Sequence, residues 1–242
     1  MPTPNPLPNP SAVPLGGPPD RPWHPLLIEI LTTRQVRTET GEVLPLDSEV
    51  DPNEGQLIDD VVTERGFRHG LEVGCAYGVS ALFACQALGR RPEPSHTIVD
   101  PFQHANYRGI GLANLARAGF DFVEFHEKPS EIALPELLAS GRRFDFAVID
   151  GNHTFDHTLV DFFFANRMIG VGGVVFIDDV DMPGIRRLIR YILRYPGYRV
   201  AGVANRSDRG PTLRRRVADA FLRVLTAPLP ASYRQAVFAD DW

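Results

Sequence analysis

The chain has 242 residues, 43% of them hydrophobic and 23% charged, which is enough apolar sequence for one large globular domain or two small ones and excludes a disordered chain. The formal net charge of -5 gives no general attraction to phosphate polymers, so we expect no nucleic-acid partner. The longest apolar-plus-glycine stretch, residues 169–177, is about half of the roughly 20 residues of a membrane-spanning helix, so we expect no membrane contact. Two cysteines, Cys75 and Cys85, and no signal-peptide pattern favour the reducing cytoplasm.

The N-terminal quarter is predicted to be an arm followed by a cap. Residues 1–25 carry a proline at nearly every second or third position and no apolar periodicity, which predicts a disordered arm. Residues 26–66 are predicted to form a helical cap. Its first helix starts at Pro25. Its second spans residues 51–65, where Asp51, Pro52 and Glu54 have the order of a helix start.

Short apolar runs alternate with amphipathic stretches from residue 67 to the end, and we take residues 67–242 as one α/β domain. We expect a single doubly wound, mostly parallel sheet, because runs such as 147–149 and 174–177 are apolar on both faces. The predicted strands are 70–74, 96–100, 121–125, 144–150 and 172–178, and the predicted helices are 79–89, 106–118, 131–140, 154–169 and 183–195. After Pro196 we expect last strands at 198–204 and 233–238, one of them an antiparallel C-terminal edge, and a helix around 213–225.

The turn after the first strand of this domain has a glycine pattern. It reads Gly74-Cys75-Ala76-Tyr77-Gly78, with Glu72 before it and Ser80 after it. The dinucleotide fingerprint G-x-G-x-x-G is absent, since Ala76 and Val79 stand where glycines would be, which disfavours a nicotinamide dehydrogenase. An acid followed by Gly-x-x-x-Gly suits an uncharged nucleoside with a short zwitterionic tail.

A second acid follows the second strand. Asp100, next to Pro101, lies 26 residues after Gly74 (100 - 74). A carboxylate at this strand end can accept hydrogen bonds from both hydroxyls of a ribose. The two features together predict a nucleoside site.

These motifs and the segment Asp150-Gly151-Asn152-His153 resemble the class I S-adenosylmethionine-dependent methyltransferases, in particular the catechol O-methyltransferase-like subgroup, over roughly residues 54–203. The resemblance implies the Rossmann-like methyltransferase fold. It implies that the loop from Glu72 to Ser80 holds the methionine part of S-adenosylmethionine, that Asp100 holds the ribose, and that the adenine lies near Ser130.

Three carboxylates end two predicted strands. Asp150 ends the fourth, and Asp178 and Asp179 end the fifth, 28 residues later (178 - 150). Clustered carboxylates repel one another, and oxygen ligands suit magnesium or manganese, so we predict a divalent metal on these three residues. The two neighbours converge only if the chain leaves strand geometry. The alternative is that Asp179 or Asp181 caps the next helix.

His153 stands where catechol-type enzymes have a lysine general base. We predict that His153, with Asp150, is catalytic, because a histidine accepts protons near neutrality. Asp150 is also counted among the cofactor-binding and metal-ligating residues. His157, one turn later, makes half of a zinc pattern with His153, but no third ligand has convincing spacing. A helix-start histidine bonded to backbone is the plainer interpretation.

The predicted reaction is methyl transfer from S-adenosylmethionine to a hydroxyl oxygen of a small molecule, assisted by the metal. One alternative is a metal-independent methyltransferase. Another is a non-catalytic nucleoside-binding regulator or scaffold that uses the proline-rich arm and an arginine cluster (Arg206, Arg209 and residues 214–216) as interaction surfaces. The acceptor and the oligomeric state, a homodimer included, stay open.

Overall fold

The computed structural model describes residues 15–48, 50–204 and 222–226. Its centre is a seven-stranded sheet in the order β5-β4-β3-β6-β7-β9-β8. The five strands β3 to β7 pair with one another in parallel, and β9 is antiparallel to both of its neighbours. The strands are β3 (His69–Val73), β4 (Ser95–Val99), β5 (Val123–His126), β6 (Phe144–Ile149), β7 (Ile169–Ile177), β8 (Arg199–Ala204) and β9 (Leu222–Thr226).

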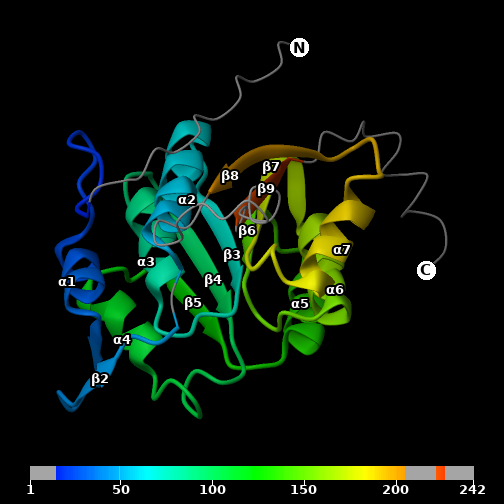
Figure 1. Cartoon of the computed structure of the whole chain (residues 1–242). Coiled ribbons are helices and arrows are strands. Elements are labelled where there is room, and N and C mark those ends of the chain that lie inside the picture. The colour runs from blue at the N-terminus through cyan, green and yellow to red at the C-terminus, as the bar shows by residue number, and fades with distance from the viewer. Residues whose placement is uncertain (1–14, 49, 205–221, 227–242) are drawn as a thin grey trace, which may run out of the picture.

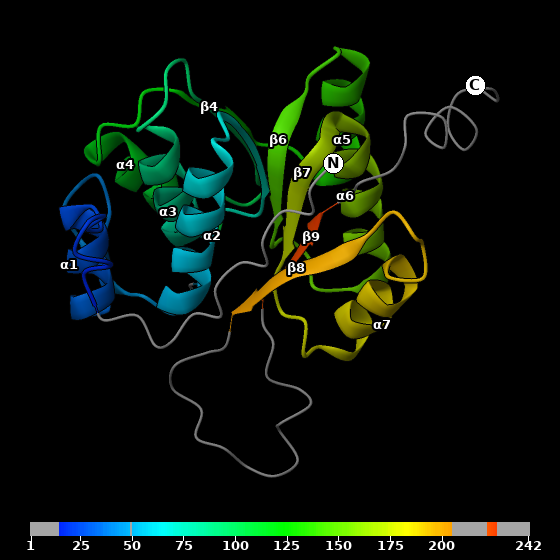
Figure 2. The same cartoon turned by 90° about the horizontal axis from the view of Figure 1, so that it is seen from above.

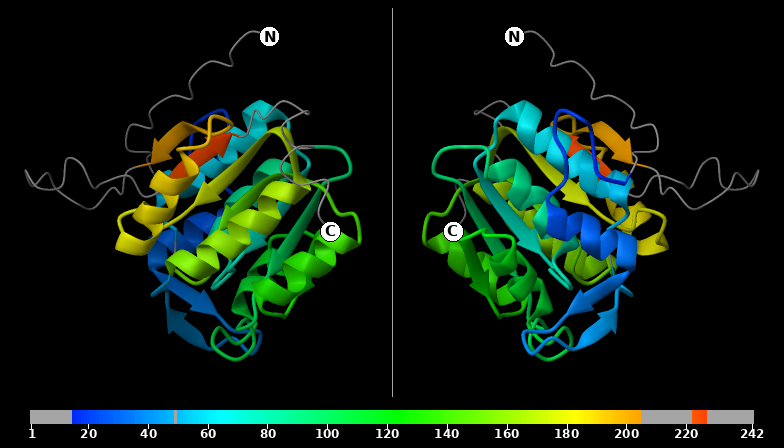
Figure 3. Two further views of the ribbon diagram at one scale, coloured as in Figure 1. Left: turned by 90° about the vertical axis from the view of Figure 1, so that its right-hand side faces the viewer. Right: turned by 90° about the vertical axis from the view of Figure 1, so that its left-hand side faces the viewer.

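Helices cover both faces of this sheet (Figures 1 and 2). One face carries α1 (Pro25–Thr33), α2 (Pro52–Arg65), α3 (Val79–Leu88) and α4 (Ile110–Arg117). The other carries α5 (Ser130–Ala139), α6 (Phe155–Met168) and α7 (Pro183–Ile192). Figure 3 shows the two helical faces in turn, the green and yellow helices on the left and the blue and cyan ones on the right. The predicted doubly wound α/β fold is confirmed.

The start of α2 follows from its sequence. The Asp51 carboxylate accepts from the Asn53 N–H, and the Glu54 carboxylate accepts from the Asp51 N–H at 2.8 Å, so the predicted start signals form a capping box. The apolar stripe of this helix is buried against α3 and the sheet; its members are Leu57, Ile58, Val61 and Val62.

The first helices are joined to the rest by a buried polar cluster. The Asp59 side chain of α2 is 1% exposed and accepts hydrogen bonds from Arg21 and Arg90, at 3.1 and 3.0 Å, and from Gln86 at 2.7 Å. A buried carboxylate is tolerated only with such partners. The cluster therefore anchors the segment before α1 to α2 and α3.

The structure corrects the sequence predictions at the two ends. A two-stranded sheet of β1 (Gln35–Arg37) and β2 (Val43–Pro45), which the sequence analysis does not contain, lies between α1 and α2. Residues 222–225, expected in a helix, belong to β9 because they pair with β7 and β8. The edge strand β8 runs parallel to the central strands, and the antiparallel strand lies inside the edge. Residues 213–221 and 233–238 lie outside the described part of the chain.

In the described ranges, no helix is both long and apolar enough to cross a membrane.

Candidate active site

A cavity of about 440 Å³ opens at the carboxyl ends of the parallel strands. Loops after β3, β4 and β6 line it, together with the start of α5, which is where ligands bind in open α/β sheets. The volume is in the range of small-molecule sites. The lining includes Gly74, Cys75, Ala76, Asp100, Pro101, Phe102, Ser130, Asp150, Gly151, Asn152 and His153.

The glycine loop is built by close backbone approach. Gly74 has φ +88°, and a Cβ there would clash with the carbonyl oxygen of Asp150. Only glycine combines this conformation with this contact. The loop after β3 therefore lies directly against the loop after β6, which places Gly74 and Asp150 at one point of the cavity.

Asp100 lies beside this loop, as predicted. Its carboxylate is 3% exposed and accepts three backbone N–H groups, from Cys75 at 3.0 Å, Ala76 at 3.2 Å and Phe102 at 2.8 Å. It thus fixes the glycine loop, a role that the sequence analysis did not assign. Its predicted ribose contact stays a prediction.

Glu72 and Ser80 form a separate buried group. The Ser80 hydroxyl donates to Glu72, whose other oxygen pairs with His96 Nε2 at 2.6 Å. Glu72 and His96 are 0% exposed, and none of the three lines the cavity. They hold β3, β4 and α3 together behind the glycine loop.

Tyr77 and Gly78 also lie behind the cavity lining. Gly78 is the left-handed N-cap of α3, with φ +79°. The Tyr77 ring is 8% exposed and meets the Tyr107 ring edge-on, with 5.3 Å between centroids. Tyr107 itself lines the cavity.

The three predicted acids lie near one another at the ends of β6 and β7. Burial and the charges of Asp178 and Asp179 raise the pKa of Asp150 well above its usual value. Asp179 has φ +51°, so the chain leaves strand geometry there, as convergence requires. The N-cap residue of α7 is Met182, and not Asp179 or Asp181 as the alternative expected.

His153 lies between these carboxylates. Its Nδ1 is 3.1 Å from Asp179 Oδ2, and its Nε2 is 4.0 Å from Asp150 Oδ1. The side chain is 37% exposed and lines the cavity. With Nδ1–H donating to Asp179, Nε2 carries the lone pair and can accept a proton.

Metal ligation has mixed support from the same residues. Three carboxylates are suitable donors for magnesium or manganese. However, Asp179 faces His153, and the Asp178 carboxylate accepts from the Asp179 N–H at 2.7 Å. Within the described ranges, no three histidine, cysteine, aspartate or glutamate side chains come together in a metal-binding group. The pair of His153 and His157 therefore has no third ligand there.

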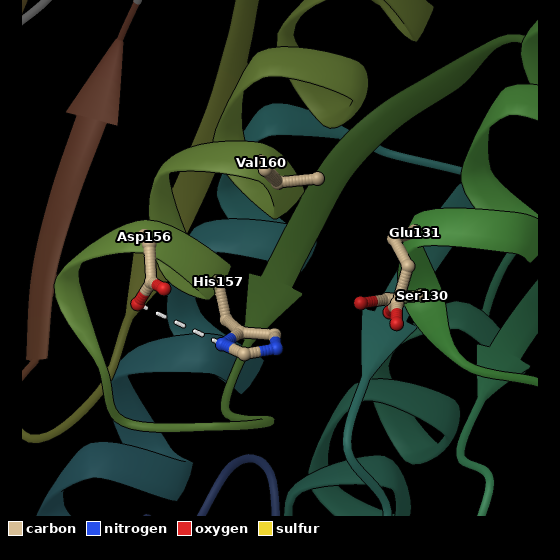
Figure 4. A pocket seen from close by; sticks show the side chains of 5 residues that line it. All are labelled: Ser130, Glu131, Asp156, His157 and Val160. Atoms are coloured by element: carbon tan, nitrogen blue, oxygen red, sulfur yellow. Dashed lines mark ion pairs between the residues drawn. The ribbon is translucent and has the colours of Figure 1, made fainter.

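A smaller cavity of about 150 Å³ adjoins the first, between α5 and α6. Ser130, Glu131 and His157 line both. Figure 4 shows the His157 imidazole pointing across the gap toward Ser130, with its ion pair to Asp156 on the other side. His157 Nδ1 lies 2.9 Å from the Thr154 hydroxyl, so this histidine is held by its own helix start.

Some cavity residues were missed by the sequence analysis. Ser48 comes from the segment before α2, and Tyr107 from the turns before α4. Burial and the charge of Asp100 raise the pKa of Tyr107, which also hydrogen-bonds to Ser48. No motif marks either residue, because a wall built by a distant segment depends on the tertiary fold.

Comparison with known proteins identifies the domain. Residues 71–180 match a family model described as a methyltransferase domain. This segment is an S-adenosylmethionine-dependent methyltransferase domain. It contains the glycine loop, Asp100, the acids and His153. The methyltransferase resemblance stated from the motifs is therefore confirmed.

Solved methyltransferases share the fold over most of the chain. The O-methyltransferase from Bacillus cereus, in complex with SAH, is 21% identical, with a TM-score of 0.66 over 85% of this chain and 92% of that one. The O-methyltransferase TomG from Streptomyces achromogenes, involved in tomaymycin synthesis and in complex with SAM, is 22% identical, with a TM-score of 0.59 over 75% and 82%. No curated protein sequence matches the chain.

Proposed function

We propose that this methyltransferase transfers the methyl group of S-adenosylmethionine to a hydroxyl oxygen of a small molecule. The single observation that carries the proposal is the position of His153. It lines the same cavity as the glycine loop and has a carboxylate partner 3.1 Å from Nδ1. A hydroxyl acceptor needs a base, whereas the sulfonium donor supplies the methyl group without one.

The cofactor would be held by the loops after β3 and β4. The predicted set is Glu72, Gly74, Cys75, Ala76, Tyr77, Gly78, Ser80, Asp100, Pro101, Ser130 and Asp150. Of these, the cavity-lining members are placed to touch the ligand, and Glu72, Tyr77, Gly78 and Ser80 would act by shaping the loop from behind. When bound, S-adenosylmethionine supplies the electrophilic methyl group.

The protein's own residues would move one proton. His153 Nε2 would take the proton from the acceptor hydroxyl during methyl transfer, in which the oxygen–carbon bond forms, the carbon–sulfur bond of the donor breaks and SAH is left. Asp179, bonded to Nδ1–H, would hold the ring and stabilise the imidazolium that forms. Asp150, 4.0 Å from Nε2, would add to that stabilisation.

A divalent metal on Asp150, Asp178 and Asp179 is the second part of the proposal. It is favoured by the raised pKa of Asp150, since three carboxylates that repel one another would gain from a bound dication. The metal would supply Lewis acidity at the acceptor oxygens. The three side chains do not form a metal-binding group in the described structure, so the proton transfer is assigned to His153 alone.

The chain's regions have different proposed parts in this function. Residues 67–242 would hold donor and base, and the cap of residues 26–66 would close the cavity through Ser48. Of the predicted disordered arm, residues 1–14 lie outside the described part of the chain. The prediction is wrong for its last residues, because Trp23 is 2% exposed and donates a hydrogen bond to Gln56 of α2.

The test uses calorimetry and turnover. The purified chain should bind SAH in calorimetry. With S-adenosylmethionine and a catechol or another vicinal diol it should produce SAH, and the acceptor should carry the new methyl group on oxygen. Absence of SAH binding by folded protein would refute the function. Full turnover in EDTA, with Asp178→Asn unimpaired, would refute only the metal.

A further inference from the structure

Asp161 of α6 is a buried carboxylate that the catalytic scheme does not use. It is 1% exposed, and its Oδ1 has no hydrogen-bond partner in the described part of the chain. Burying a carboxylate without full hydrogen bonding costs several kcal/mol, so a side chain of this kind needs a reason for its place.

The carboxylate lies under two loops of the cavity. It hydrogen-bonds to the Ser130 side chain at the start of α5. Its Oδ2 would be 3.8 Å from a Cβ at Gly151, so it also lies directly beneath the loop after β6. Ser130 and Gly151 both line the large cavity, and Ser130 also lines the small one.

Ser130, at the start of α5, lines both cavities. The N-cap of α5 is Pro129, which makes no side-chain cap, so the first turn of this helix has no capping side chain to fix it. A hydrogen bond from Ser130 to a rigidly buried acid supplies that fixation from α6, the helix that packs against α5.

We propose that Asp161 is a positioning residue, which holds Ser130 and thereby sets the shape of the end of the cavity that receives the nucleoside part of the methyl donor. The inference rests on the proposed function for the identity of the ligand. It adds a residue outside the cavity lining to those that determine cofactor affinity.

The first experiment measures SAH binding by calorimetry. Asp161→Leu, which keeps the shape and removes the acceptor, should weaken SAH binding about tenfold, as loss of a hydrogen bond to a charged group does. Ser130→Ala should weaken it by a similar factor. Ser140→Ala is the matched control: this serine at the other end of α5 bonds to the Leu137 carbonyl and should leave SAH affinity unchanged.

The decisive readout is the double variant. If Asp161 acts through Ser130, the pair Asp161→Leu and Ser130→Ala should bind SAH within about twofold of either single variant. Asp161→Asn keeps an acceptor and should lose only about threefold. Losses that multiply in the double variant, or an Asp161→Leu variant with unchanged affinity, would overturn the proposal.

Two further results keep the test sharp. If the leucine variant fails to fold, Asp161→Asn replaces it in the cycle with the smaller expected loss. Turnover of Asp161→Asn at saturating S-adenosylmethionine should equal that of the wild type, with the KM for the donor raised. A fall in kcat at unchanged KM would contradict a positioning role. Failure of the wild type itself to bind SAH would count against the function, and not against this assignment.

Discussion

The carboxylates in the two halves of the cavity have opposite environments. In the half formed by β3 and β4, the Asp100 carboxylate accepts hydrogen bonds from three backbone N–H groups, which fix both the side chain and the glycine loop. In the half formed by β6 and β7, burial and neighbouring acids raise the pKa of Asp150. Asp161, on the helix after β6, has its pKa raised to about 6 by burial.

The difference separates binding from chemistry. Backbone hydrogen bonds fix the first half in one shape, as expected of a surface that must fit one ligand. The second half keeps charges that are poorly compensated, and perturbed acids of this kind concentrate where protons are moved. Substitutions in the first half should therefore act on cofactor affinity and folding, and those of His153 and Asp179 in the second half on turnover. Asp161 is the exception, because it is proposed to act on cofactor affinity through Ser130.

The largest effect should come from Gly74→Ala. The substitution puts a side chain at φ +88° against the backbone of Asp150, so the two loops must separate. We expect the free energy of unfolding to fall by about 3 kcal/mol or more, with loss of SAH binding, measured by denaturant unfolding and calorimetry. Gly119→Ala, at φ +78° with nothing within 4 Å of its Cβ, should cost only about 1 kcal/mol and keep binding. Equal losses of stability and binding in Gly74→Ala and Gly119→Ala would contradict the special role of the glycine loop.

His153→Ala should lower kcat by about 10²- to 10⁴-fold, the contribution of a general base. SAH affinity should stay within about twofold, because His153 belongs to the other half. Steady-state kinetics and calorimetry on the same preparation decide this. His157→Ala, which removes a histidine held by Thr154 one turn away, is the control and should keep most of the turnover. Loss of SAH binding by His153→Ala would contradict the assignment of binding and chemistry to different halves of the cavity.

The sequence could predict most of the scaffold, and the roles of the site residues stay predictions. Apolar runs such as 144–149 and 174–177 predict parallel strands because both faces of those strands are covered. Of the residues at their ends, Asp150 lines the cavity, whereas Asp178 and Asp179 do not. Ser48 and Tyr107 could not be predicted, because their place depends on how a distant segment and an irregular turn pack. The strand β9 was missed for a related reason: its pairing with β7 and β8 overrides a helical pattern in the local sequence.

Asp161 predicts how stability varies with pH. Its pKa of about 6 in the folded protein lies above the value near 3.9 of an unfolded chain. The folded state therefore binds the proton more tightly, and this contribution is full below about pH 4 and lost as pH rises through about 6. The difference amounts to about 2 to 3 kcal/mol. Relative to Asp161→Asn, the wild type should lose that much unfolding free energy between pH 4 and 7, measured by urea titrations. Parallel curves for the two proteins would contradict this.

Asp179→Asn should have the smallest effect. An amide still bonds to His153 Nδ1–H, but it no longer stabilises the imidazolium with a charge, so kcat should fall about tenfold with unchanged SAH affinity. Asp181→Asn, two residues further along the same loop, is the control and should keep wild-type turnover, since the scheme gives it no part.

Asp179→Asn also distinguishes the proposed function with a metal from the one without. If Asp179 orients His153, activity in EDTA should show the same tenfold ratio between variant and wild type. If Asp179 instead binds a metal, the variant should need a higher magnesium concentration for half-maximal activity. In EDTA neither the variant nor the wild type should then turn over.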